Sequence, residues 1–158
     1  LCRARFIYGD KGLLNDFNQL RLAVLSRQRD VSELRTQVVE MREKMRLHLA
    51  KGTAELFDLK QDQGGIADIE FIVQFLTLAH CHAAHSVAKW TDNVRVLESL
   101  VESDFISAAD AQSLKDAYLT YRNQSHRLSL QNKTFTLYTA ELREHKAQVM
   151  RIWQTVMQ

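Results

Sequence analysis

Proline is absent from this 158-residue sequence, and glycine occurs only five times. A sandwich or barrel of short strands needs many turns, and proline and glycine residues form most of them. No segment alternates between apolar and polar residues with a period of two, which is the pattern of a half-buried strand. The sequence therefore predicts an all-α protein.

A strong excess of charge and a long apolar run are lacking too. The 21 basic and 19 acidic residues leave a net charge of +2, without the basic stripe that is typical of nucleic-acid binding. No apolar run approaches the roughly 20 residues of a transmembrane helix. We therefore expect no nucleic-acid partner and no membrane association.

Cysteine is scarce, since only Cys2 and Cys81 are present. Two cysteines make no disulfide framework, and we expect two free thiols in a reducing cytoplasm. The sequence opens at Leu1 without an initiator methionine or a signal peptide,. We therefore expect a piece of a longer cytoplasmic protein, in which residues 1–12 are the end of a preceding element and residues 13–158 form one domain.

Apolar residues recur at helical spacing in about six segments, which predicts a helical bundle. The first helix is expected over residues 14–25. The second follows Asp30 as N-cap, with Glu33 at position N3, and should end at Gly52,. A third helix, from residue 66 to about 82, is apolar nearly all round and should lie at the centre. The remaining helices are expected to start at residues 90–93, after Ser107, and after Thr139, which follows an irregular segment over residues 131–138.

Two adjacent glycines, Gly64 and Gly65, directly precede the predicted central helix. Such a pair lets the backbone approach a ligand closely, and a helix start offers N–H groups to an anion. Lys60 could contact the same phosphate. The Gly-Lys-Ser/Thr of a P-loop does not follow, so spacing alone favours the alternative of a tight connector.

The predicted central helix carries two acids near its start. On a helical wheel Asp68 falls on the apolar side beside Phe71, whereas Glu70 falls in a polar stripe. Asp68 either bonds free N–H groups as the N3 residue or faces a cleft with a nucleotide or partner domain. For Glu70 we favour a buried salt bridge to Arg42 or Arg46 of the second helix, because a buried acid is costly unless it is paired.

Two further patterns resemble parts of metal sites, but each lacks residues that a complete site needs. His80, Cys81, His82 and His85 have no second cluster that would complete four zinc ligands, so a histidine-rich helix end is the favoured interpretation. No pair of aspartates one residue apart on a strand, which would hold a catalytic metal, is present. We therefore predict no metal site and no catalytic residue in this chain, and no activity for the chain alone.

Motifs spread along the chain carry a family resemblance. They are Asp58-Leu-Lys60 followed by Gly64-Gly-Ile-Ala-Asp-Ile-Glu-Phe-Ile-Val-Gln74, then Val39 to Leu49, Lys89 to Glu98, and Arg3-Ala-Arg5 with Tyr8-Gly-Asp10. In combination they resemble the bacterial glutamine synthetase adenylyltransferases, which are bifunctional adenylyl-transferring and adenylyl-removing enzymes. A related helical domain follows the catalytic core of the PII-uridylyltransferases.

The resemblance implies a place in a larger enzyme. That family has two nucleotidyltransferase halves, each followed by a helical domain, and this chain resembles the helical domain of the C-terminal, adenylylating half. Residues 1–12 would then be the exit from the upstream nucleotidyltransferase domain. The full-length enzyme would transfer AMP from ATP, with Mg²⁺, to a tyrosine of glutamine synthetase and so regulate nitrogen assimilation.

The resemblance also implies roles for five residues that match the signature. Gly64 and Gly65, with Lys60, would lie near the ATP phosphates in one wall of the nucleotide cleft, and the catalytic carboxylates would belong to the upstream domain. Asp68 would orient the loop or an arginine of that domain, with Glu70 as a second supporting residue. The alternative is a docking module that binds glutamine synthetase or a PII-type signal protein through charged outer helices.

Overall fold

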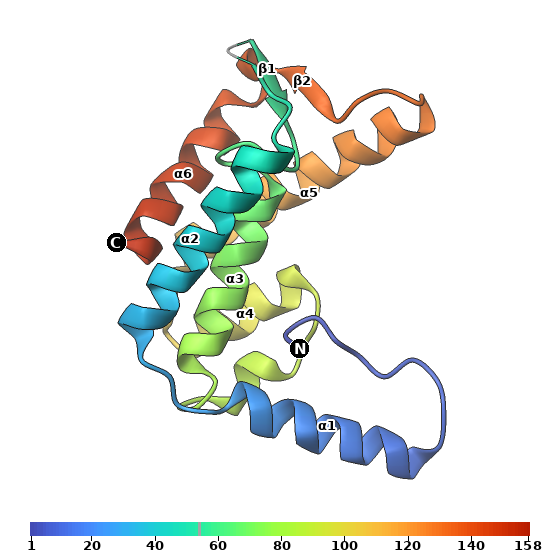
Figure 1. Ribbon diagram of the computed structural model, residues 1–158, viewed down its shortest axis with the longest axis vertical. Helices are drawn as coiled ribbons and strands as arrows, with labels where there is room; N and C mark the ends of the chain where they lie inside the picture. Colours follow the sequence, from blue (N-terminus) through green and yellow to red (C-terminus); the bar gives the residue numbers. More distant parts are fainter. Residues whose placement is uncertain (54) are drawn as a thin grey trace.

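The computed structural model describes residues 1–53 and 55–158, and within them the protein is helical apart from one small sheet (Figure 1). The α-helices are α1 (Lys11–Leu25), α2 (Val31–Leu49), α3 (Ile66–His80), α4 (Asn93–Glu102), α5 (Ala108–Leu130) and α6 (Arg143–Met157). The short elements are the 3₁₀ helices η1 (His85–Ala88) and η2 (Thr139–Leu142) and the strands β1 (Leu56–Asp58) and β2 (Thr136–Tyr138). The predicted all-α bundle is confirmed.

Helix α3 is the central element of the bundle. It runs through the middle of the molecule and contacts α2, α4, α5 and α6 (Figure 1). Ile69 and Ile72 are fully buried, and Val73, Phe75 and Leu76 are nearly so. A helix that is apolar all round buries all its faces, which explains why the helix is central and why any acid on it needs a partner.

Capping residues fix the starts of three helices, and the sequence predicted two of these caps, Asp30 and Ser107. The Asp30 side chain accepts a hydrogen bond from the Glu33 amide over 3.0 Å, and Ser107 accepts one from the Asp110 amide over 3.1 Å. Asp92 caps α4 in the same way. Side-chain oxygens at these positions satisfy N–H groups that have no partner inside the helix.

Three predicted helix boundaries are wrong. Helix α1 begins at Lys11 rather than at residue 14, because Asp10 caps it. Helix α2 ends at Leu49, and Ala50 leaves it in an extended conformation, so Gly52 does not terminate it. Helix α6 begins at Arg143 without a side-chain cap; Thr139 starts η2 instead. The division at residue 12 stays a prediction.

The small sheet was not predicted. Strands β1 and β2 pair antiparallel with Phe57 opposite Leu137, and three residues each are too few to show an alternating pattern. The pairing joins the chain that follows α2 to the chain that precedes α6. Phe57 is fully buried, and its ring meets the ring of Tyr121 edge-on at a centroid distance of 5.6 Å. The sheet thereby holds the loop before α3 on the bundle.

Helix α1 extends across one end of the molecule (Figure 1). Arg21 anchors it, since its guanidinium donates to the carbonyl oxygens of Cys2 over 2.8 Å, of Trp90 over 3.3 Å and of Ala88. None of the described helices combines the length and the hydropathy that a membrane crossing needs.

Candidate functional site

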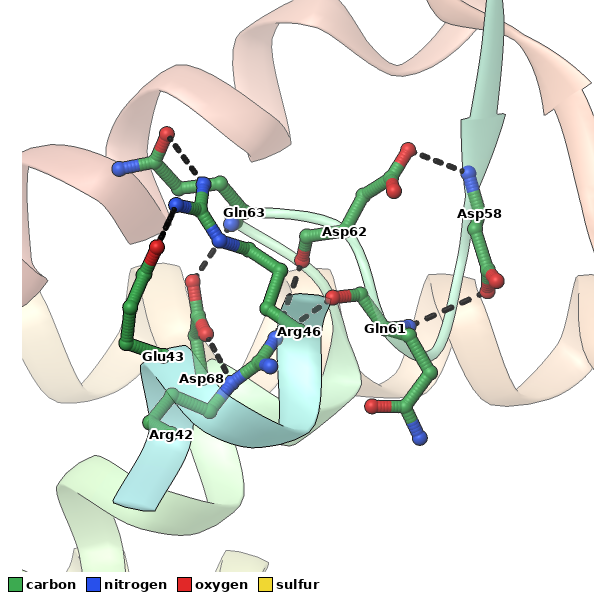
Figure 2. A network of polar contacts seen from close by, with 9 residues as sticks. Arg42, Glu43, Arg46, Asp58, Gln61, Asp62, Gln63 and Asp68 are labelled. Carbon is green, nitrogen blue, oxygen red and sulfur yellow. Dashed lines mark hydrogen bonds and ion pairs between the residues drawn. The ribbon is translucent and has the colours of Figure 1, made fainter. Parts of the chain in front are cut away.

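A buried ion pair joins α2 to the start of α3 (Figure 2). Arg42 Nε donates to Asp68 Oδ1 over 2.6 Å, and each side chain is only 4% exposed. Arg42 Nη2 also donates to the carbonyl oxygens of Gln61, over 2.8 Å, and Asp62, over 3.4 Å. One arginine therefore holds both the helix and the preceding loop.

The second oxygen of Asp68 accepts a hydrogen bond from the Gly64 amide over 2.6 Å. This contact agrees with the interpretation of Asp68 as an N3 residue that bonds N–H groups at the helix start. Burial raises the pKa of the Asp68 carboxyl, and the charge of Arg42 and the Gly64 hydrogen bond oppose that rise. The carboxylate therefore depends on both donors for its charge, as a buried acid must.

Glu70 does not pair with the second helix, so that prediction is wrong. Arg42 pairs with Asp68, Arg46 pairs within its own helix, and Glu70 forms an ion pair with Arg3. Two helical residues that are two positions apart point about 200° apart. Because α2 packs on the side of Asp68, Glu70 faces the other side, where the N-terminal segment lies.

The two glycines are needed because parts of the chain approach them closely. Gly64 has φ +83°, and a Cβ there would lie 2.9 Å from the carbonyl oxygen of Lys146 in α6. A Cβ on Gly65 would lie 2.9 Å from the carbonyl oxygen of Leu59. Real side chains essentially never approach backbone so closely. The sequence suggested that a ligand approaches the two glycines closely. In this structure, other backbone segments of the same chain do so.

The backbone amides of this loop also have partners inside the chain. Four consecutive amides, from Gly64 to Ala67, donate hydrogen bonds. The Gly64 amide donates to Asp68 Oδ2, and the next three donate in turn to the carbonyl oxygens of Asp62, Leu59 and Lys60. Contrary to the expectation from sequence, these four N–H groups are not free for an anion. A nucleotide contact at Gly64 and Gly65 stays a prediction.

Asp58 and Asp62 organise the loop, and the sequence analysis missed this role. Asp58 Oδ1 accepts from the amides of Lys60, over 2.9 Å, and Gln61, over 3.1 Å, and Asp62 Oδ2 accepts from the Asp58 amide over 2.8 Å (Figure 2). Aspartates often fold turns by bonding amides two or three residues ahead. The spacing of these acids beside a glycine pair was the available signal.

Lys60 and Glu70 come together on the face opposite α2. Both line a pocket of about 380 Å³ between α3 and α5. Lys60 is exposed, and its Nζ lies 3.7 Å from the centroid of the Phe135 ring. Of the five predicted site residues, the structure thus places Lys60 and Glu70 in one pocket and buries Asp68, Gly64 and Gly65.

His80, the last residue of α3, and Cys81, which follows it, serve packing. The His80 ring stacks on Phe105 at a centroid distance of 4.1 Å, and burial lowers the pKa of His80. Cys81 is fully buried, and burial raises the pKa of its thiol. Within residues 1–53 and 55–158, no three His, Cys, Asp or Glu side chains are arranged to hold a metal ion.

Comparison with known proteins identifies the family. The profile of the family described as GlnD PII-uridylyltransferase matches residues 32–155, which include the whole of α3 and the loop that precedes it. The chain belongs to this family. The matched region contains both residues of the Arg42–Asp68 pair.

Curated relatives extend the match over the whole chain. The bifunctional glutamine synthetase adenylyltransferase/adenylyl-removing enzyme of Shewanella oneidensis is 42% identical over 158 residues, which are 100% of this chain and 17% of the relative. The enzyme of the same name from Shewanella loihica is 46% identical over 157 residues, 99% of this chain and 16% of the relative. That from Mannheimia haemolytica is 40% identical, again over 157 residues and with 16% of the relative covered.

The resemblance inferred from the motifs is therefore confirmed. The chain is homologous to a segment of glutamine synthetase adenylyltransferase, and it spans about one sixth of the length of these relatives.

Proposed function

We propose that this domain packs on the nucleotidyltransferase domain of a longer protein and forms one wall of its nucleotide cleft. The Arg42–Asp68 pair carries the proposal. A buried ion pair adds little stability over a well-packed apolar pair, because desolvation offsets the attraction. Its use here is positional, since Arg42 contacts α3 and two loop carbonyls at once. It presents the loop in one fixed conformation.

The full-length protein, in this proposal, transfers AMP from ATP to a tyrosine of glutamine synthetase in the cytoplasm, as part of the regulation of nitrogen assimilation. The names of the curated relatives support the adenylyl transfer. Carboxylates grouped to hold Mg²⁺ are absent from the described residues, so the metal would bind the upstream domain. The domain alone would then be inactive.

Lys60 is the group through which the loop would contact a phosphate. The four amides from Gly64 onward donate inside the chain, whereas the Lys60 ammonium is exposed and has no carboxylate partner among the described residues. The glycines then act indirectly, because they let the loop lie directly on α6.

Adenylyl transfer by an Asp68→Asn variant of the full-length protein tests this proposal. The amide keeps an acceptor for Gly64 and removes the charge that binds Arg42, so we expect kcat/KM for ATP to fall at least about tenfold. Asp110→Asn is the matched control, since Asp110 is also the N3 residue of a helix and pairs with Arg151 over 2.5 Å, a contact that involves no loop residue. Normal transfer by a folded Asp68→Asn variant would overturn the proposal.

A docking role is the second candidate, and exposed apolar residues favour it. Leu13 and Leu20 on α1 are 60% and 63% exposed, and Ile7 and Tyr8 before it are 81% and 95% exposed. Glutamine synthetase or a PII-type protein would cover these residues. Calorimetric titration of the chain with each protein tests the role: Leu20→Glu should abolish binding, and a normal affinity for that variant would contradict it.

A further inference from the structure

A second groove lies on the side of α3 away from the Arg42–Asp68 pair. It is the pocket of about 380 Å³ that contains Lys60 and Glu70, and side chains of α5 form its other wall. The glycines of the loop do not line it. The groove is therefore a feature separate from the loop backbone, although Lys60 belongs to both.

Positive charge dominates this groove. Arg3, Lys60 and Arg122 line it, and Glu70 is the one carboxylate among the described lining residues. Glu70 is already paired with Arg3. Lys60 and Arg122 have aromatic rings as neighbours instead, because the Arg122 guanidinium lies 5.6 Å from the centroid of the Tyr118 ring. Two cations thus face the groove without a carboxylate partner among the described residues.

Ser125 adds a buried polar group that lacks a partner. It lines the groove and is 5% exposed, and its hydroxyl makes no hydrogen bond to any described residue. A helical serine that does not face solvent can bond the carbonyl four residues earlier, as Ser113 does with Ala109 over 3.0 Å. Buried polar groups without partners are costly and rare. The unpaired hydroxyl therefore points to a ligand in the groove.

The same features continue into an adjoining pocket of about 480 Å³. It shares Arg3, Tyr118 and Arg122 with the first pocket. Asn93 lines it, is 2% exposed, and has a side-chain N–H₂ group without a partner in the described part of the chain. The carboxylate of Asp92 is held by Arg95 over 2.6 Å. The groove as a whole thus offers donors and little negative charge.

We infer that this groove binds a phosphate group. A phosphate oxygen accepts strongly from arginine, which can donate two parallel hydrogen bonds, and from lysine and hydroxyl groups. Arg122 and Lys60 would supply the charge and Ser125 a neutral donor. The inference shares Lys60 with the proposed function, but it is argued from Arg122 and Ser125 of α5 and from binding by the chain alone. It holds whether the phosphate is a free anion or belongs to a nucleotide.

Calorimetric titration of the 158-residue chain with inorganic phosphate, pyrophosphate and ATP tests the inference. We expect saturable binding that Arg122→Gln weakens at least about tenfold, since a charge-assisted contact is lost. Arg127→Gln is the matched control, because Arg127 is exposed on the same helix and lines neither pocket. Circular dichroism confirms that each variant is folded.

A Ser125→Ala variant separates binding from folding. The methyl group removes a hydroxyl without an internal partner, so the thermal midpoint should stay level or rise while phosphate affinity falls about fivefold. Tightest binding of ATP would assign the site to nucleotides, and equal binding of pyrophosphate would assign it to free anions; either supports the inference. Absence of saturable binding by all three, or equal weakening by Arg127→Gln, would overturn it without bearing on adenylyl transfer.

Discussion

The carboxylate of Asp68 receives hydrogen bonds from two separate parts of the chain, Arg42 in α2 and the Gly64 amide. Each partner of a buried pair is stabilised chiefly by the other, so the loss of one costs more than the pair contributes. The sequence predicted that an acid on this apolar helix needs an arginine. The prediction assigned this pair to Glu70 instead of Asp68, because the choice between the two acids depends on which side of α3 packs against α2.

Asp68→Ala should lower the free energy of unfolding by about 3–5 kcal/mol, because Arg42 is left buried without a counter-ion. Asp110→Ala, which breaks an ion pair whose arginine is 51% exposed, should cost about 1 kcal/mol or less. Urea denaturation of the chain measures both.

The double variant Arg42→Met with Asp68→Leu is the control for this prediction. It removes both charges and should recover the part of the loss that comes from the unpaired Arg42, while the Gly64 amide and the carbonyl oxygens of Gln61 and Asp62 stay without these partners,. Equal costs for Asp68→Ala and Asp110→Ala would contradict the account of the buried pair.

His80 should make stability depend on pH. Burial lowers its pKa in the folded protein, and the charge of His82 lowers it further. The unfolded chain then binds the proton more readily than the folded protein. The contribution of His80 to the free energy of unfolding is therefore fully present above the ordinary histidine pKa, and it is lost as pH falls through the lowered pKa of the folded protein.

Denaturant melts at pH 7.5 and pH 5.5 measure this dependence. His80→Gln should reduce the loss of stability on acidification, and His48→Gln, at an exposed histidine of α2, should leave it unchanged. An identical pH dependence for wild type and His80→Gln would show that the prediction is wrong.

At the scale of elements, α2, the loop and α3 form one unit whose helices were predictable and whose loop was not. Helical spacing and the caps at Asp30 and Ser107 predicted the positions of the helices to within a few residues. The strands are too short to leave a pattern. The loop is shaped by Asp58 and Asp62, whose spacing beside the glycine pair was a signal, and by contacts with α2 and α6, which have no local signature.

The Gly64→Ala variant tests the close packing of this loop against α6. The residue has φ +83°, and a Cβ would meet backbone at 2.9 Å. The left-handed conformation alone costs an alanine about 1–2 kcal/mol, so we expect a loss of at least about 2 kcal/mol in the free energy of unfolding.

Gly12→Ala in α1 is the control for this prediction. Among the described residues, a Cβ there would approach the Asp10 carboxylate, which caps α1 by accepting from the Gly12 amide, at 2.8 Å. Because the loss of such a cap costs about 1 kcal/mol, the change should stay near that value. A loss for Gly64→Ala no larger than that of the control would contradict the described packing.

At the scale of the whole molecule, motifs pointed to the glutamine synthetase adenylyltransferases, and curated relatives of that name, which match nearly the whole chain, confirm it together with the related family profile over residues 32–155. The arrangement of the site could not be deduced from them. Lys60 and Glu70 match the same signature as Asp68 but lie on another face. The phosphate groove depends on Arg122 and Ser125, which lie outside the signature and meet Lys60 only after folding.

The most direct test of the proposed nucleotide wall is the KM for ATP of the full-length protein with Lys60→Gln. Lys60 is exposed, so the change should not unfold the domain. Lys44→Gln, at an exposed lysine of α2, is the control. We predict a KM for ATP raised about tenfold or more by Lys60→Gln, since a charge-assisted phosphate contact is lost, and an unchanged KM for the control. An unchanged KM with Lys60→Gln would contradict the placement of this loop at the nucleotide.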